Sequence, residues 1–514
     1  MSKTIIIIGA GLAGLSAALQ AAENGCNVKL VSSLPSERAQ SVMAEGGINA
    51  ALNTKDENDS PEEHFTDTIK AACGLADPNA VWGMTQAAPE LVHWLLKLGV
   101  QFNMSGYDDV DLRNFGGQKK KRTAFAQSDT GKQIMTAMID AVRRKEASGM
   151  VERFSHHSFL TLRLCGNICC GCVIRDEYSQ ETVELPGDAV IVATGGMHGL
   201  FGNTTGSLSN TGEVTAELFR LGVPLANGEM IQYHPTTVKC GGKRMLISEA
   251  ARGEGGRLFA MKDGKQWYFM EEKYPELGNL MPRDITAREI WKVSHESEVF
   301  LDMTEISEEI ISNKLSGLAD DCMTYLHKDI RKEPVSVLPG IHYFMGGILV
   351  DEQHRTPVQN LYAAGECCAQ YHGANRLGGN SLLGALYGGR VAAKSACEQA
   401  DVVDLSCATQ IDVPPASQIS EIKQLNKVMQ ETMGVVRNEN TLLNGIQTVQ
   451  ALTGNLPLLG MAVPKSALAR KESRGAHWRE DYPKSNDDDY LKTTVARFNG
   501  KQIQISFVPV PERR

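Results

Sequence analysis

The sequence predicts an α/β fold in which a nucleotide-binding domain is interrupted by an inserted domain and followed by a helical one. The chain opens on a β-α-β unit: a β-branched strand at 4–8, an apolar helix ending near 24, and a second strand at 27–31. A further buried strand at 188–193 ends in Thr194-Gly195-Gly196, and another at 360–365 ends in a glycine turn. A chain of 514 residues is long enough for roughly three domains.

The remaining elements follow in chain order. Apolar spacing predicts helices at 61–73, 81–99 and 131–147, the last beginning after a cap at Asp129. A hairpin is predicted from 151–164 and 168–175 around a Gly166-Asn167 turn. The C-terminal half is predicted to hold helices near 307–327, at 381–399, 418–433 and 439–453, a linker at 412–415, and a polar tail. We therefore expect a nucleotide domain in two parts (1–223 and 341–405), an insert at 224–340 and a helical domain at 416–514.

Composition excludes several classes of function. Lys plus Arg is 52 and Asp plus Glu is 61, a net charge of −9, which argues against a nucleic-acid partner. The 12 cysteines are scattered, which favours reduced thiols in a cytosolic protein. Cys169 and Cys172 form a C-x-x-C without a second pair, so no metal site is expected. Glycines interrupt the uncharged stretch at 4–22, and we expect a cytoplasmic protein, free or docked on the membrane's cytoplasmic face through partners.

The glycines after the first strand predict a dinucleotide site. Gly9 allows a tight turn, Gly11 lets the backbone approach a pyrophosphate, and Gly14 permits close packing of helix on strand. The acidic residue that usually follows the second strand is missing. Ser32 and Ser33 stand there, so the ribose must be held another way.

Two more elements favour FAD over NAD. Ala44-Glu45-Gly46-Gly47 forms a second glycine set, and Ala363-Ala364-Gly365-Glu366 lies far down the chain. A distal strand–glycine–acid element of this kind is typical of folds that hold FAD, where its carboxylate accepts bonds from sugar hydroxyls. Neither an iron–sulfur cysteine pattern nor a haem motif is present in the sequence, so electrons must come from elsewhere.

Several ordered motifs carry a family resemblance: Gln232-Tyr233-His234-Pro235-Thr236, Ser248-Glu249-Ala250-Ala251-Arg252-Gly253, Pro282-Arg283-Asp284, His342-Tyr343-Phe344-Met345, His372-Gly373-Ala374-Asn375-Arg376 and Arg470-Lys471-Glu472-Ser473-Arg474. With them the chain resembles the flavoprotein subunits of succinate dehydrogenase and fumarate reductase, and the related L-aspartate oxidases. The resemblance implies a Rossmann-like FAD-binding domain, an inserted α+β capping domain and a C-terminal helical domain. It further implies a C4 dicarboxylate substrate, fumarate or succinate, and either an iron–sulfur subunit with a membrane anchor or a soluble electron donor.

The resemblance also assigns roles to residues. Arg283 would protonate the substrate, Glu249 and Arg252 would relay protons to it, and His234, His342 and Arg376 would hold the two carboxylates. Arginine grips a carboxylate through a planar fork, and histidine adds directed donors. The FAD-binding residues implied are Gly9, Ala10, Gly11, Gly14, Ser32, Ser33, Ser41, Ala44, Glu45, Gly46, Gly47, Ala193, Thr194, Gly195, Glu213, Glu366, Arg376, Ser381 and Leu382.

Three departures from the family pattern matter. Gln40 stands where the respiratory members carry the histidine that bonds to the flavin, so FAD is expected to be non-covalent and fumarate reduction to be the favoured direction. Glu213 replaces the family's aspartate. Phe115 stands where aspartate oxidases carry a glutamate before Gly-Gly, which speaks against L-aspartate oxidation. L-aspartate oxidase, a reductase of another 2-enoate and a non-catalytic FAD subunit are the alternatives.

Overall fold

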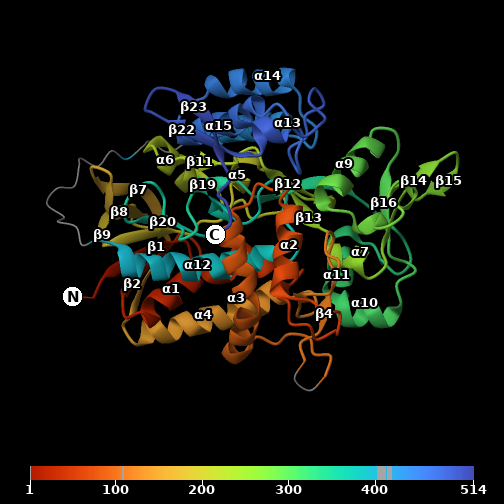
Figure 1. Cartoon of the computed structure of the whole chain (residues 1–514), viewed down its shortest axis with the longest axis horizontal. Coiled ribbons are helices and arrows are strands. Elements are labelled where there is room, and N and C mark those ends of the chain that lie inside the picture. Colours follow the sequence, from red (N-terminus) through yellow and green to blue (C-terminus); the bar gives the residue numbers. More distant parts are fainter. Residues whose placement is uncertain (1, 107–108, 402–412, 414–418) are drawn as a thin grey trace.

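The computed structural model describes the chain except residues 1, 107–108, 402–412 and 414–418 (Figure 1). Its centre is a five-stranded parallel sheet in the order β20-β10-β1-β2-β6. These strands are Leu361–Ala363, Ala189–Val192, Thr4–Ile8, Asn27–Ser32 and Val151–Ser155. The first β-α-β unit is therefore confirmed almost to the residue, with α1 at Leu12–Glu23.

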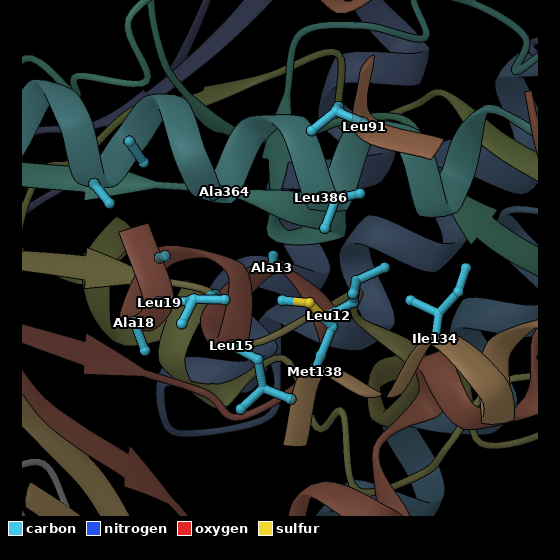
Figure 2. Packing of buried hydrophobic residues seen from close by; sticks show 14 of the residues in the cluster. Leu12, Ala13, Leu15, Ala18, Leu19, Leu91, Ile134, Met138, Ala364 and Leu386 are labelled. Atoms are coloured by element: carbon cyan, nitrogen blue, oxygen red, sulfur yellow. The ribbon is translucent and has the colours of Figure 1, made fainter. Parts of the chain in front are cut away.

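Alternate residues of the parallel sheet face two different layers, as the period of a strand requires. Ile5 and Ile7 pack against helices α1, α4 (Thr130–Ala147) and α12 (Asn380–Gln399), and Figure 2 shows Leu386 of α12 close to Leu12 and Ala13 of α1. Ile6 and Ile8 pack against the antiparallel sheet β7-β8-β9 (His157–Cys165, Ile168–Asp176, Thr182–Pro186).

The predicted hairpin was partly wrong. His156 has a φ of 57°, in the left-handed region, and it divides the expected strand at 151–164 in two. Residues before it form β6 of the parallel sheet, and residues after it form β7, which pairs with β8. Helices α2 (Pro61–Ala71) and α3 (Pro78–Leu98) confirm two predicted helices, and short strands β3 (Ile48–Asn49), β4 (Leu112–Arg113) and β5 (Thr123–Ala124) form a small separate sheet.

Residues 231–344 contain two small sheets and short helices. The sheets are β13-β12-β18 (Lys243–Leu246, Ile231–Cys240, Leu338–Phe344) and β15-β14-β16-β17 (Lys265–Trp267, Arg257–Lys262, Val299–Asp302, Val335–Ser336). Helices α7 (Glu249–Gly253), α8 (Phe269–Lys273) and α9 (Arg283–Val293) accompany them. The helix predicted near 307–327 is broken into α10 (Glu308–Lys314), α11 (Ser316–Asp321) and a π-helical turn at Cys322–Leu326.

The C-terminal part is helical but ends in strands. Helix α13 (Ile419–Thr432) packs against α5 (His198–Phe201), and α15 (Asn455–Ala469) packs against α6 (Glu213–Arg220). Helix α14 (Glu439–Gln450) packs against α13 and α15. The expected polar tail instead holds the short helix α16 (Asp487–Tyr490) and the hairpin of β22 (Lys492–Phe498) and β23 (Ile503–Pro509). Strand β22 pairs with β11 (Leu225–Ala226) in a sheet that also holds β19 (Gly347–Leu349) and β21 (Cys368–Ala369). Most of the predicted linker at 412–415 lies outside the described residues.

Two sequence expectations concern the chain as a whole. Ten cysteines are free in the described part, whereas Cys165 is disulfide-bonded, so the prediction of reduced thiols is wrong for Cys165. Among the described residues, no helix combines the length and the apolar character that a membrane crossing requires.

Candidate active site

One cavity of about 710 Å³ runs from the first glycine turn to the helix that begins at Arg283. Nearly every residue that the sequence and the resemblance single out lies on its wall. Gly14 and Arg252 are the two that do not, and both lie directly behind wall residues. We call the part of the cavity lined by residues 9–47, together with the segments at 177, 193–195, 213, 366 and 381–382, the nucleotide wall.

The glycine turn fits a dinucleotide. A Cβ on Gly9 would lie 2.3 Å from the carbonyl oxygen of Ala193, and one on Gly14 would lie 1.8 Å from that of Gly9, so both positions require glycine for packing. Gly11 differs, because a Cβ there would meet nothing closer than 3.7 Å. Gly11 lines the cavity at the start of α1, where helix N–H groups favour an anion such as a pyrophosphate.

At the end of β2, serine side chains line the cavity where the usual acid is missing. Ser32 Oγ is buried and lacks a hydrogen-bond partner within the described chain, so it is free to bond a ligand. Glu177, from the turn after β8, also lies on the wall there, and Ser158 Oγ donates a 2.6 Å bond to it. Sequence reasoning missed Glu177, because it comes from a segment far along the chain.

Further along the wall, Gln40 and Glu45 have distinct surroundings. The backbone N–H of Ser207 donates a 2.6 Å hydrogen bond to Gln40 Oε1. Burial raises the pKa of Glu45 to about 8, and the charges of Asp321 and Asp129 add to the effect. Glu45 Oε2 is buried without a partner among the described atoms. At neutral pH the Glu45 carboxyl is therefore mostly protonated.

The wall continues through four more segments, at 193–195, 213, 366 and 381–382. Glu366 accepts a 3.0 Å bond from the backbone N–H of Phe344, and burial raises the pKa of Glu213. The other wall residues expected to contact FAD are Ala10, Ser33, Ser41, Ala44, Gly46, Gly47, Ala193, Thr194, Gly195, Ser381 and Leu382.

At the far end, charged side chains meet in what we call the cationic corner: His234, Glu249, Arg252, Arg283, His342 and Arg376. Arg283 Nη2 lies 2.6 Å and Nε 2.8 Å from Glu249 Oε2, and Arg252 Nη2 lies 3.2 Å from Glu249 Oε1. Burial raises the pKa of Glu249, but attraction to Arg283 and Arg252 outweighs it and holds that pKa below its ordinary value. The corner therefore joins two guanidinium groups through one carboxylate.

Two histidines and a third arginine complete the corner. The rings of His234 and His342 lie 5.1 Å apart, and buried His234 Nε2 has no partner in the described part of the chain. Burial, and then the charge of Arg283, lowers the pKa of both histidines well below the ordinary value, so both are neutral at pH 7. Arg376 stacks 4.2 Å over the Tyr343 ring, and its buried Nε has no partner within the described residues.

Sequence reasoning missed several residues that hold the corner together. Gln232 accepts a 3.1 Å bond from Arg283 Nη1 and donates to the backbone oxygen of Arg376. Thr205 Oγ1 lies 2.8 Å from His342 Nδ1 and so orients that ring. Gln232 could have been found from its spacing, because residues two apart on a strand share a face and His234 follows it by two. Thr205 lies in a segment without a motif.

Comparisons with known proteins fit this geometry. A model described as "FAD binding domain" matches residues 4–382, and one described as "Fumarate reductase flavoprotein C-term" matches residues 453–513. The succinate dehydrogenase flavoprotein subunit of Bacillus subtilis is 39% identical over an alignment that covers 96% of this chain and 94% of the relative. The chain belongs to the succinate dehydrogenase and fumarate reductase flavoprotein family.

Members of this flavoprotein family bind FAD and catalyse oxidation and reduction, and this chain is an FAD-dependent oxidoreductase of the same α/β fold. A FrdA mutant of E. coli quinol fumarate reductase superimposes with a TM-score of 0.90 at 28% identity, covering 99% of this chain and 97% of that one. The family also includes L-aspartate oxidases. The one from Streptomyces coelicolor is 31% identical, covering 100% of this chain and 94% of the relative.

Proposed function

We propose that this flavoprotein interconverts fumarate and succinate, with fumarate reduction as the favoured direction. The observation that carries the proposal is the cationic corner, which opens into the same cavity as the nucleotide wall. A C4 dicarboxylate carries two negative charges, and the corner presents buried arginines and histidines with unpartnered donors at one end of the cavity. Bound FAD would supply the two-electron hydride chemistry there.

The chain's own residues have three tasks in this proposal. Arg376 and the N–H groups of His234 and His342 bind the substrate carboxylates, and the pull on one carboxylate polarises the double bond. Arg283 donates a proton to the alkene carbon that does not receive the hydride. Glu249 is in contact with both Arg283 and Arg252, so it can pass a proton back to Arg283. Closure of 224–340 over the cavity would exclude water.

We infer that the flavin is held without a covalent bond. An amide cannot form the bond that the family's histidine forms, and here the Gln40 side chain is occupied by the N–H of Ser207. A covalent link withdraws electrons and so favours succinate oxidation, whereas its absence favours fumarate reduction. Acid denaturation followed by filtration should release all yellow flavin with the small molecules. Flavin retained on the protein would contradict this.

Electrons must reach the flavin from another molecule. Metal-ligating clusters of His, Cys, Asp or Glu are absent from the described residues. Several relatives are named as flavoprotein subunits. We propose either an iron–sulfur subunit, which would place the chain at the membrane through an anchor, or a soluble donor.

The assay that decides between activities uses purified holoprotein. Reduced viologen should drive rapid fumarate reduction, and L-aspartate under oxygen should yield no peroxide. Phe115 is buried and its ring would meet a Cβ on Gly46 at 2.8 Å, so it packs against the nucleotide wall and offers no partner to a substrate ammonium. Robust peroxide production would make L-aspartate oxidase the better assignment, and turnover of another 2-enoate in preference to fumarate would change the substrate.

A further inference from the structure

Arg244 is a cation on the cavity wall that the proposed mechanism does not use. It lies on β13, next to the β12–β13 turn, and its side chain is half-buried. Its Nε donates a 2.5 Å bond to Thr237 Oγ1, and Nη2 lies 3.2 Å and 3.3 Å from the carbonyl oxygens of Thr237 and Leu338. All three acceptors are neutral. Nη1 has no hydrogen-bond partner among the described residues.

The charge of Arg244 is uncompensated. Within the described chain, no carboxylate lies at ion-pair distance from its guanidinium. Burial lowers the pKa of Arg244, which is the mark of a charge held partly away from water without a counter-ion. Neighbouring arginines of the same region, such as Arg257 and Arg252, do have carboxylate partners. A half-buried arginine that lines a cavity and keeps one nitrogen without a partner among the described residues is therefore suited to bind an anion.

The position of Arg244 is fixed by its surroundings. A Cβ on Gly340 would lie 2.6 Å from Arg244 Nε, so the guanidinium fits only because residue 340 is glycine. Gly340 is paired with His234 across β12 and β18. The backbone N–H of Arg244 donates to Thr204, and the next residue, Thr205, holds His342. Arg244 therefore lies just outside the two histidines of the cationic corner.

We propose that Arg244 forms an outer carboxylate site that receives the dianionic substrate before it reaches the cationic corner. The ligand class is a short dicarboxylate, and the contact is the free Nη1 with one carboxylate oxygen. This inference rests on the proposed function. Lys243, the preceding residue, is also on the wall but is exposed, so its charge is well hydrated and binds an anion weakly.

The test is a titration of the oxidised holoprotein with malonate, a dicarboxylate that cannot react. The change in flavin absorbance reports binding. Arg244→Gln should raise the malonate Kd about tenfold, as loss of one charged hydrogen bond predicts. Arg244→Lys should recover part of that loss, and Lys243→Gln should change the Kd by less than about twofold. Flavin content and the thermal midpoint of each variant check that it is folded.

Steady-state kinetics provide a second measurement, whose result would not change if Arg244 only stabilised the fold. For fumarate reduction, Arg244→Gln should raise KM and leave kcat near wild type, and kcat/KM should depend less steeply on salt. Equal malonate Kd and equal salt dependence in folded Arg244→Gln and wild type would overturn the outer site alone. A wild-type protein that neither binds malonate nor reduces fumarate would overturn the proposed function itself.

Discussion

The nucleotide wall and the cationic corner share one cavity but are built in different ways. The wall consists mainly of backbone, glycines and hydroxyl groups, and its Glu45 carboxyl is mostly protonated at neutral pH. The corner consists of charged side chains joined through Glu249. In the proposed function the wall recognises its ligand by shape, whereas the corner recognises its ligand by charge. Substitutions in the corner should therefore lower turnover, whereas substitutions on the wall should lower the affinity for FAD.

The largest effect is expected in the corner. Arg283→Lys keeps the positive charge but loses the forked contact with Glu249 and the bond to Gln232. Fumarate turnover should fall by several orders of magnitude while the FAD content stays unchanged. The measurement is viologen-driven fumarate reduction normalised to flavin absorbance.

Arg257→Lys is the matched control for that substitution. Arg257 also pairs with a carboxylate, Glu271, on the same part of the chain, but it lies away from the cavity wall. Its replacement should leave turnover within about twofold of wild type, as expected for a half-exposed ion pair away from the cavity. If Arg283→Lys behaves like Arg257→Lys, Arg283 has no part in the chemistry.

The next effect tests the wall. Gly11→Ala adds a Cβ where the protein itself leaves room, so the fold should survive while a bound pyrophosphate is crowded. We expect at least about a tenfold loss in FAD affinity, measured by flavin fluorescence quenching in the apoprotein. Gly242→Ala, where a Cβ meets nothing within 4 Å, is the control and should bind FAD normally. Normal binding by both variants would mean that the pyrophosphate lies elsewhere.

Ionisable groups in the corner and on the wall should change the free energy of unfolding in opposite directions with pH. His234 and His342 have pKa values far below those of an unfolded chain, so on acidification below about pH 6.5 the unfolded state takes up protons that the folded state does not. Each histidine should then lower the free energy of unfolding by up to about 1.4 kcal/mol per pH unit. Denaturant unfolding at pH 7 and 5.5 should show a smaller loss in His234→Gln than in wild type. His93→Gln, at an exposed position of α3, should match wild type.

The smallest expected effect is the contribution of Glu45 to stability. It should change with pH in the direction opposite to that of the two histidines. The pKa of Glu45 is raised to about 8 in the folded protein, so the unfolded state releases this proton first as the pH rises from about 4.5. Stability from this group is present at low pH and is lost as the pH rises to 8. Glu45→Gln cannot ionise and should be more stable than wild type at pH 8 but not at pH 4.5. A variant that is equally stable or weaker at pH 8 would show that Glu45 is ionised in the native protein.

The nucleotide wall and the cationic corner also differ in how far the sequence alone predicts them. Local patterns located the wall: β1, α1 and the glycine turn were placed almost to the residue, because a short strand, a turn and a helix are encoded by neighbours. The C-terminal hairpin was missed. Its two strands are neighbours in the chain, and the Asn499-Gly500 turn between them is a local signal that sequence reasoning overlooked. The pairing of β22 with β11, more than 260 residues earlier, is different, because no local pattern reports it.

The corner illustrates the limit more sharply. Its charged residues were named through the family's motifs, but their mutual contacts join segments from 232 to 376. Thr205, Glu177 and Arg244 carry no motif, and their positions on the cavity wall emerge only from the folded chain. Sequence therefore supplies the residue types of the site, and the tertiary structure decides which of them meet.

The central claim is that the cationic corner selects a dianion for reduction beside the flavin. The most direct measurement is a single turnover: holoprotein reduced anaerobically by one equivalent is mixed with fumarate or with crotonate, which has one carboxylate only. Oxidised flavin absorbance should return rapidly with fumarate, and at least about a hundredfold more slowly with crotonate, as loss of a buried charged contact predicts. Equal rates with the two acids, or a flavin that stays reduced in fumarate, would contradict the claim.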